Sequence, residues 1–193
     1  MRVDWFHMGG GSFEQLGRWP YPEGMDANSN SDGEVVEIFI AERGGLPQRR
    51  MDEVEALEGK GLKSDRFLEG TSYWSGIDEC QVTLIAFEAL EEIATKTEVQ
   101  VMSGEHRRNI VTRGVDLLKL RGSRFRVGEA LLEFDRPRPP CRYIQSVSEK
   151  GMTKALGRNR GGICARVVEG GLIRPGDPIE IVEKPSRLGS LLG

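Results

Sequence analysis

The sequence predicts a mostly β fold with a few short helices, an α+β chain arranged as a closed or nearly closed barrel or as a sandwich. The first observation is a series of short apolar or β-branched runs, separated by Gly, Pro and Asp turns. The second is that no long helical pattern joins these runs, whereas a parallel sheet would need helical crossovers. The strands predicted from this series are residues 109–112, 123–127, 130–134, 143–147, 163–168 and 179–182.

The first half of the domain contains two more predicted strands and one helix. Apolar residues alternate with charged ones over residues 34–40, and residues 81–85 form a second β-branched run. Phe87, Leu90 and Ala94 follow at helical spacing among glutamates, which predicts a short amphipathic helix.

Two glycine-containing turns are predicted to be tight hairpin corners. Residues 127–129 lead into the strand at 130–134, and residues 175–177 lead into the strand at 179–182. Repeated short strands joined in this way favour an antiparallel barrel or sandwich.

The chain is predicted to hold one domain between two unstructured ends. Residues 1–33 contain turn formers without a sustained period, so they form a leader that is flexible or packs loosely on the core. The domain covers residues 34–183, and residues 184–193 form a C-terminal tail. At 193 residues with 38% hydrophobic side chains, the chain is long enough to bury a substantial core.

Composition excludes several classes of protein. The sequence has no apolar run long enough to span a membrane and no apolar segment typical of a signal peptide, so a cytoplasmic location is expected. The net charge of −3 argues against non-specific binding to nucleic acid or to an anionic membrane surface. Residues 105–142, however, carry ten Lys or Arg against five Asp or Glu, and this local excess predicts an anionic small ligand.

The three cysteines have to be considered singly, because their number is odd and none has the close paired spacing of a zinc site. Cys164 lies in an apolar run, where packing in the core is the simpler interpretation. Cys80 follows two acidic residues that would disfavour a thiolate, so no role is assigned to it.

Cys141 lies in the most informative segment of the sequence, Arg-Pro-Arg-Pro-Pro-Cys-Arg at residues 136–142. Its three prolines stiffen the backbone and favour a rigid loop over a central strand. The neighbouring arginines, Arg138 and Arg142 among them, favour a thiolate, which is both a nucleophile and a ligand for soft transition metals. The alternative is a buried, unreactive cysteine in a proline-rich connection.

Two other segments concentrate basic residues at turns. Residues 104–110 include Arg107 and Asn109 just before a predicted strand, and residues 60–67 include Lys63 and Arg66 beside a glycine and an aspartate. Both suit an anion such as a phosphate, and both could equally be solvated basic turns. His106, in the first segment, could titrate near neutrality beside a bound anion or be an ordinary surface histidine.

Taken together, these segments resemble the MOSC domain, named for the C-terminal region of molybdenum cofactor sulfurases and found also in small stand-alone bacterial proteins. The resemblance runs from about residue 34 to residue 182. The family's pattern has a glycine where this chain has Ser64, and the leader has no counterpart in it. The resemblance is carried, in order, by residues 61–66, 107–111, 137–141, 161–167 and 171–177.

The resemblance implies a β-barrel-like fold that binds a molybdenum cofactor of the molybdopterin type. The residue matching Cys141 would bind the molybdenum or carry sulfur, with Arg138 beside it, and an association with pyridoxal phosphate also comes with the family. Because the cofactor is an anionic pterin, cationic and polar side chains are its expected contacts. These are Lys63, Arg66, Arg107, Asn109 and Arg142.

Two functions from different classes follow from the resemblance, and a third reading is a binding domain without a cofactor. The first is a reductase that removes oxygen from N-hydroxylated compounds, with electrons supplied by a separate donor protein. The second is a sulfur carrier or cofactor-delivery module, in which Cys141 accepts sulfur from a donor protein as a persulfide. The sequence does not separate the two.

Overall fold

The computed structural model describes residues 32–77 and 79–184. The predicted leader, residues 1–33, and the tail, residues 184–193, therefore lie almost wholly outside the described part of the chain. No helix within the described residues is long and apolar enough to cross a membrane.

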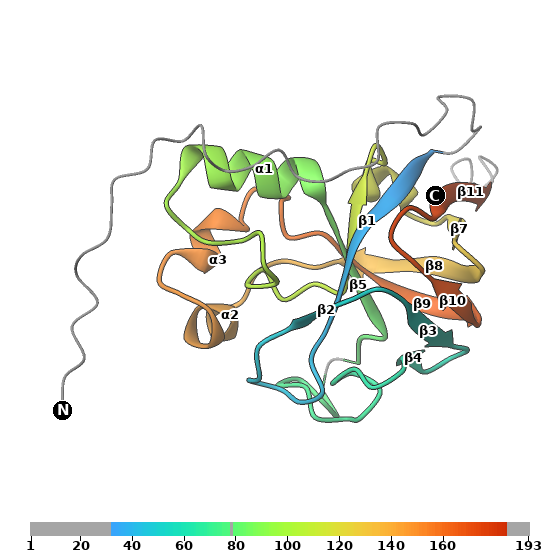
Figure 1. The fold of residues 1–193 in the computed structure, drawn as a ribbon, viewed down its shortest axis with the longest axis horizontal. Coiled ribbons are helices and arrows are strands. Elements are labelled where there is room, and N and C mark those ends of the chain that lie inside the picture. Colours follow the sequence, from blue (N-terminus) through green and yellow to red (C-terminus); the bar gives the residue numbers. More distant parts are fainter. Residues whose placement is uncertain (1–31, 78, 185–193) are drawn as a thin grey trace, which may run out of the picture.

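Seven strands form a closed barrel (Figure 1). The barrel closes where β1 pairs antiparallel with β11, with Gly33 opposite Ile179. Among the described strands, β5 and β6 are the one parallel pair, and the chain between them contains a helix, as a parallel crossover requires. Around the barrel the order is β11 (Pro178–Glu183), β7 (Arg124–Val127), β8 (Ala130–Pro137), β9 (Ile163–Glu169), β5 (Val82–Ala86), β6 (Ile110–Arg113) and β1 (Gly33–Ile40).

Shorter elements extend and flank the barrel. β2 (Arg49–Met51) pairs with the C-terminal end of β1. A small second sheet has the order β10 (Gly171–Ile173), β3 (Val54–Leu57) and β4 (Gly61–Leu62). A 3₁₀ helix, η2 (Leu117–Leu120), follows β6.

The helices lie together on one side of the barrel (Figure 1). They are α1 (Phe87–Lys96), α2 (Arg142–Val147) and α3 (Met152–Ala155). This arrangement divides the core in two. Alternate residues of the strands, such as Leu84 and Ile110, fill the barrel, whereas neighbours such as Ile85 and Val111 point outward and pack with residues of the helices. The predicted fold class, mostly β with a few short helices on a barrel, is confirmed.

Two local predictions are wrong. Residues 143–147 form helix α2 instead of a strand, and Ile144 is the buried residue of this helix, so the alternating burial of a strand does not occur there. Residues 127–129 do form a two-residue hairpin between β7 and β8. The turn at residues 175–177 does not, because β10 pairs with β3 whereas β11 pairs with β7 and β1.

Candidate functional site

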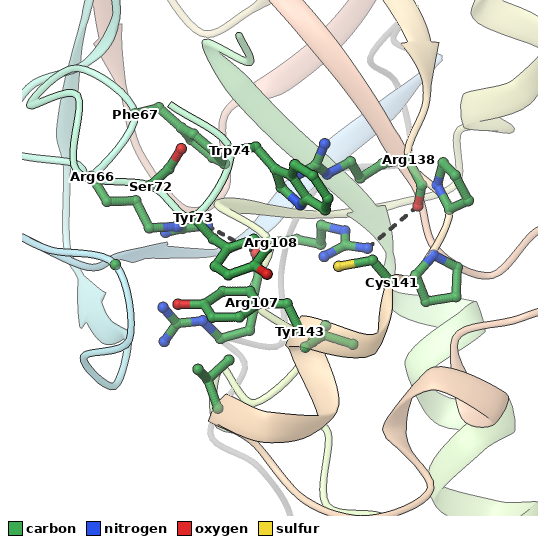
Figure 2. Close-up of a pocket in the computed structure, with 15 residues that line it drawn as sticks. Arg66, Phe67, Ser72, Tyr73, Trp74, Arg107, Arg108, Arg138, Cys141 and Tyr143 are labelled. Atoms are coloured by element: carbon green, nitrogen blue, oxygen red, sulfur yellow. Dashed lines mark hydrogen bonds between the residues drawn. The ribbon is translucent and has the colours of Figure 1, made fainter. Parts of the chain in front are cut away.

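Cys141 lines a pocket between the end of the barrel and helix α2 (Figure 2). The chain leaves β8 at Pro137, passes through two prolines and begins α2 directly after Cys141. Prolines give no backbone donor for a sheet, so the strand ends there and the cysteine lies on a short stiff connection, as predicted. The pocket is lined by Gly44, Arg66, Phe67, Ser72, Tyr73, Trp74, Arg107, Arg108, Arg138, Pro139, Pro140, Cys141, Tyr143, Ile144 and Val147.

Four arginines supply all the formal charge among these lining residues. Arg66 follows β4, Arg107 and Arg108 precede β6, and Arg138 follows β8. Three segments that are far apart in the sequence thus bring cationic groups to one pocket. Among the described residues, no Asp or Glu side chain lines this pocket. Such a lining is complementary to an anion.

Burial makes this positive charge costly. It lowers the pKa of Arg66, an effect that Asp65 partly opposes. Burial, and next the charge of Arg66, lower the pKa of Arg107 to about 10. Burial and the charge of Arg138 lower the pKa of Arg108 to about 10. With pKa values of about 10, Arg107 and Arg108 stay protonated at neutral pH, so a bound anion would relieve the repulsion between the positive charges.

Backbone carbonyls hold the Arg108 guanidinium beside Cys141 (Figure 2). Its Nε donates to the carbonyl of Gly161 over 2.7 Å, and a terminal nitrogen donates to the carbonyl of Arg138 over 3.3 Å (Figure 2). The backbone N–H of Arg138 in turn donates to Gly162 over 2.8 Å. A Cβ on Gly161 would lie 2.3 Å from the Arg138 carbonyl oxygen, so this close approach requires glycine.

Asp65 and Asn109 form the buried support of the site. One oxygen of the Asp65 carboxylate accepts hydrogen bonds from the side chains of Arg66 and Asn109 and from the backbone of Ala41, and its other oxygen accepts from the backbone of Phe67. Both side chains are fully buried. Asp65 therefore orients Arg66 toward the pocket, and Asn109 orients Asp65.

The residue before Asp65 explains one departure from the family's pattern. Ser64 has a φ of 61°, a left-handed conformation that glycine adopts without cost. A glycine at this position in the family would therefore serve the same turn that Ser64 makes here.

Tyr73, Trp74 and Tyr143 form an aromatic wall that closes the pocket on the side facing Arg107. Tyr73 and Tyr143 stack with their ring centroids 4.0 Å apart and an angle of 14° between the planes (Figure 2). Trp74 packs edge-on against Tyr73. The enclosed space is only about 50 Å³, which holds a few water molecules but not a pterin. Larger grooves adjoin it, one sharing Phe67 with the pocket and one sharing Arg107.

The predicted site residues divide into two groups. Cys141, Arg138, Arg66 and Arg107 line the pocket together. The other three do not: Asn109 lies buried behind it, Arg142 is exposed outside it, and Lys63 is exposed and paired with Glu55 at 2.6 Å. For Lys63, Arg142 and Asn109, contact with a cofactor stays a prediction.

The sequence interpretation did not select Arg108 or the aromatic residues as site residues. Arg108 adjoins Arg107, so its basic segment was identified without this side chain being singled out. Tyr73 and Trp74 lie in a turn-rich segment without a motif, and Tyr143 was placed in a predicted strand. A Tyr-Trp pair in a polar, turn-rich segment is the one signal that could have drawn attention to these aromatic residues.

His106 does not behave as expected for a residue that titrates near neutrality. It is fully buried, and burial together with the charges of Arg108, Arg66 and Arg107 lowers its pKa to about 3. Its Nδ1 accepts the backbone N–H of Arg108 over 3.0 Å, and its ring packs edge-on against Phe39. His106 is thus a neutral acceptor that supports the backbone of the arginine segment.

The described residues place no cluster of metal ligands at Cys141. Within residues 32–77 and 79–184 there is no cluster of three or more His, Cys, Asp or Glu side chains that could hold a metal. A sulfur ligand among cationic groups does fit an anionic cofactor that brings most of the metal's ligands itself. The lining includes no lysine, the residue that binds pyridoxal phosphate covalently, so the pocket does not fit that cofactor.

Comparison with known proteins supports the same fold. The YuaD protein of Bacillus subtilis shares 21% identity, with 77% of this chain and 94% of that chain covered and a TM-score of 0.61. YiiM from Geobacillus stearothermophilus shares 18% identity over 80% of this chain and 77% of its own, with a TM-score of 0.62. YiiM from Escherichia coli shares 21% identity over 79% and 70%, with a TM-score of 0.57.

Sequence comparison gives the family directly. No curated protein sequence matches the chain at a significant level. The family model of the MOSC domain matches residues 72–180, which is more than half of the chain and includes β5 to β10, the first half of β11, Cys141 and the arginines that precede β6. The chain therefore belongs to the MOSC domain family.

Proposed function

We propose that this protein binds a molybdenum cofactor of the molybdopterin type and reduces N-hydroxylated compounds, with Cys141 as a ligand of the metal. The observation that carries the proposal is the position of Cys141 in a pocket whose charged lining residues are four arginines. A metal bound to an anionic pterin needs a soft ligand and cationic contacts in the same place. The membership of the MOSC family supports the choice of cofactor.

The roles of the residues follow from their positions. Arg66 and Arg107 would bind the anionic end of the cofactor, because Arg107 also lines one of the larger grooves and Phe67, next to Arg66, lines the other. Arg108 and Arg138 lie with Cys141 and would stabilise negative charge around its sulfur. Asp65, Asn109 and their hydrogen bonds would keep Arg66 in place.

The bound cofactor would supply the two-electron chemistry that converts an N–OH group to N–H and water, with two protons consumed. The polypeptide would contribute binding, orientation and the exclusion of water by the aromatic wall. The electrons would come from a separate donor protein.

Entry of the cofactor would require the aromatic wall to move. The space around Cys141 is about 50 Å³, and Tyr73, 57% exposed, is the wall residue with the most freedom to swing outward. Separation of Tyr73 from Tyr143 would join the narrow pocket to the adjoining grooves. A planar ring could then stack on Tyr143 in place of Tyr73.

Elemental analysis tests this proposal. The full chain and its Cys141→Ala variant would be purified from a host that makes the cofactor, and molybdenum and pterin fluorescence would be measured in each. We expect nearly one molybdenum per chain in the wild type and a loss of at least about tenfold in the variant. Absence of metal and pterin from the wild type would contradict the proposal.

A sulfur carrier is the second candidate function, and the size of the pocket favours it. About 50 Å³ of space accepts one added sulfur atom on Cys141 without any movement of the wall. The arginines would stabilise the negative charge of the resulting persulfide. In this case the protein would take the sulfur from a donor protein and pass it on.

Mass spectrometry separates the two candidates. A carrier would show Cys141 heavier by one sulfur atom after incubation with a sulfur donor, and reductant would remove that mass. A reductase would instead oxidise an artificial electron donor only when an N-hydroxylated substrate is present. If Cys141 gained no sulfur and no substrate-dependent oxidation of the donor occurred, both functions would be contradicted.

A further inference from the structure

Cys80 and Cys164 lie against each other although 84 residues separate them in the sequence. Their sulfur atoms are 2.9 Å apart, and both residues are buried, Cys80 at 7% exposure and Cys164 at 0%. The sequence interpretation assigned core packing to Cys164 and no role to Cys80. A packing role alone does not require two sulfurs in direct contact, since apolar side chains fill a core as well.

The pair lies beside the Cys141 pocket without being part of its lining. Cys164 is in β9, where it pairs with Thr83 of β5 on one side and with Arg136 of β8 on the other. Thr83 holds Asn109 through its hydroxyl over 2.7 Å. The two sulfurs are therefore one strand away from the network that supports the arginines.

The surroundings favour one thiolate in the pair. The thiol of Cys80 donates to the sulfur of Cys164, and this hydrogen bond, together with Arg138 and Arg136, lowers the pKa of Cys164 to about 7. The same contact and burial raise the pKa of Cys80. A thiolate next to a thiol is the arrangement from which a disulfide forms.

A groove gives small molecules access to the pair. It encloses about 510 Å³ and is lined by Cys80 together with Phe67, Gly76 and other residues of the segment that carries the aromatic wall. We name residues 66–77 the wall segment. A small oxidant in this groove would reach the sulfur of Cys80, whereas Cys164, its hydrogen-bond partner, is fully buried.

We propose that Cys80 and Cys164 form a redox-active dithiol, which hydrogen peroxide converts to a disulfide that tethers the chain just after the wall segment to β9. The sulfur of Cys80, which lines the groove, passes its proton to Cys164 along their hydrogen bond and attacks one oxygen of hydrogen peroxide. The O–O bond breaks, and the released hydroxide takes up a proton and leaves as water. The resulting sulfenic acid reacts with the second sulfur, the S–O bond breaks, and a second water leaves. Two thiols and one peroxide thus give one disulfide and two waters.

The tether would act on the pocket through the wall segment. The start of the wall segment is held by two hydrogen bonds. The backbone N–H of Ala41 donates to the Asp65 carboxylate, and the backbone N–H of Arg66 donates to the carbonyl of Ala41. Cys80 follows the other end of the segment, where Ile77 is 81% exposed.

The pairing of Val82 with Ala165 already anchors the chain to β9 two residues after Cys80. A bond from Cys80 to Cys164 would move this anchor point closer to the wall segment, so oxidation would restrict the outward movement of Tyr73 and Trp74.

Thiol mapping of the full chain tests the disulfide without any substitution. Reduced protein would be treated with hydrogen peroxide, unfolded, alkylated with iodoacetamide and digested. We expect alkylated thiols to fall from three to one, with Cys141 still alkylated and one peptide linking Cys80 to Cys164. Alkylation of both Cys80 and Cys164 after peroxide treatment, or a disulfide that includes Cys141, would overturn the proposal.

Two variants and a second readout complete the test. Cys141→Ser should keep the linked peptide, and Cys80→Ser should lose it. Hydrogen exchange over residues 66–77 should be at least about threefold slower in the oxidised wild type than in the reduced protein, while exchange in α1 stays the same. Equal exchange in the two redox states would refute the tether. None of these readouts uses molybdenum, so their outcome is independent of the proposed cofactor.

Discussion

The side-chain amide of Asn109 donates a hydrogen bond to the carboxylate of Asp65 over 3.0 Å, joining two segments 44 residues apart. The amide also donates to the carbonyl of Phe39, and its oxygen accepts from the backbone and hydroxyl of Thr83. Each polar atom of the Asn109 side chain thus has a partner within the barrel. The position of Arg66 in the pocket depends on this network, because Asp65 binds Arg66 over 3.1 Å.

Replacement of the amide by a carboxylate should break this network. In Asn109→Asp a second buried carboxylate would face Asp65, and the donated hydrogen bond would be lost. We expect the free energy of unfolding to fall by roughly 3 kcal/mol, measured by urea denaturation. Asn159→Asp, the same change at an exposed position, should alter it by less than about 0.5 kcal/mol. Equal effects of the two substitutions would contradict the structural role of Asn109.

The arginine pocket predicts stabilisation by anions. Phosphate, added at constant ionic strength, should raise the melting temperature of the wild type because it relieves repulsion among buried guanidinium groups. Arg107→Met should weaken the apparent phosphate affinity by about tenfold, as expected for the loss of one charge-assisted contact. Arg121→Met, which removes an exposed arginine outside the pocket, serves as the matched control. The same phosphate response in all three proteins would argue against an anion site.

The aromatic wall should limit access to Cys141. In Tyr73→Ala the stacked partner of Tyr143 is removed, so iodoacetamide should alkylate Cys141 at least about tenfold faster than in the wild type. Peptide mapping would assign the rate to Cys141. Ile77→Ala changes an exposed residue of the same segment that does not line the pocket, and its rate should match that of the wild type. No acceleration in Tyr73→Ala would mean that the wall does not restrict access.

The neutral buried state of His106 predicts a loss of stability in acid. Its pKa is lowered from 6.5 to about 3 in the folded protein, so below pH 6.5 the unfolded chain takes up a proton that the folded chain does not. The free energy of unfolding should therefore fall as pH decreases between about 6.5 and 3, by about 2 kcal/mol from pH 7.5 to pH 5. In His106→Asn, which keeps an acceptor near Nδ1, this part of the pH dependence should disappear. Urea denaturation at several pH values measures both proteins, and parallel pH profiles would contradict the assignment.

The sequence predicted most strands of the barrel correctly. Alternating residues identified β1, and short apolar or β-branched runs identified β5 and most later strands, because their residues pack in the barrel core or against the helices. The hairpin at residues 127–129 followed from its turn residues and short length. Residues 143–147 were misread because a short apolar run is compatible with a helix as well as a strand. There, the burial of Ile144 in the apolar cluster that also contains residues of α1 and α3 decided the outcome.

For the site, the sequence by itself determined which chemical groups were available. These were a cysteine held between prolines and arginines, and basic segments that precede or follow strands. Which of these groups meet was decided by tertiary structure alone. Barrel closure brings Arg66, Arg107 and Arg138 to Cys141 but leaves Lys63 on the surface, and it places Cys80 against Cys164. The physical reason is that side-chain contacts depend on the pairing order of the strands, and that order depends on how the whole core packs rather than on any local pattern.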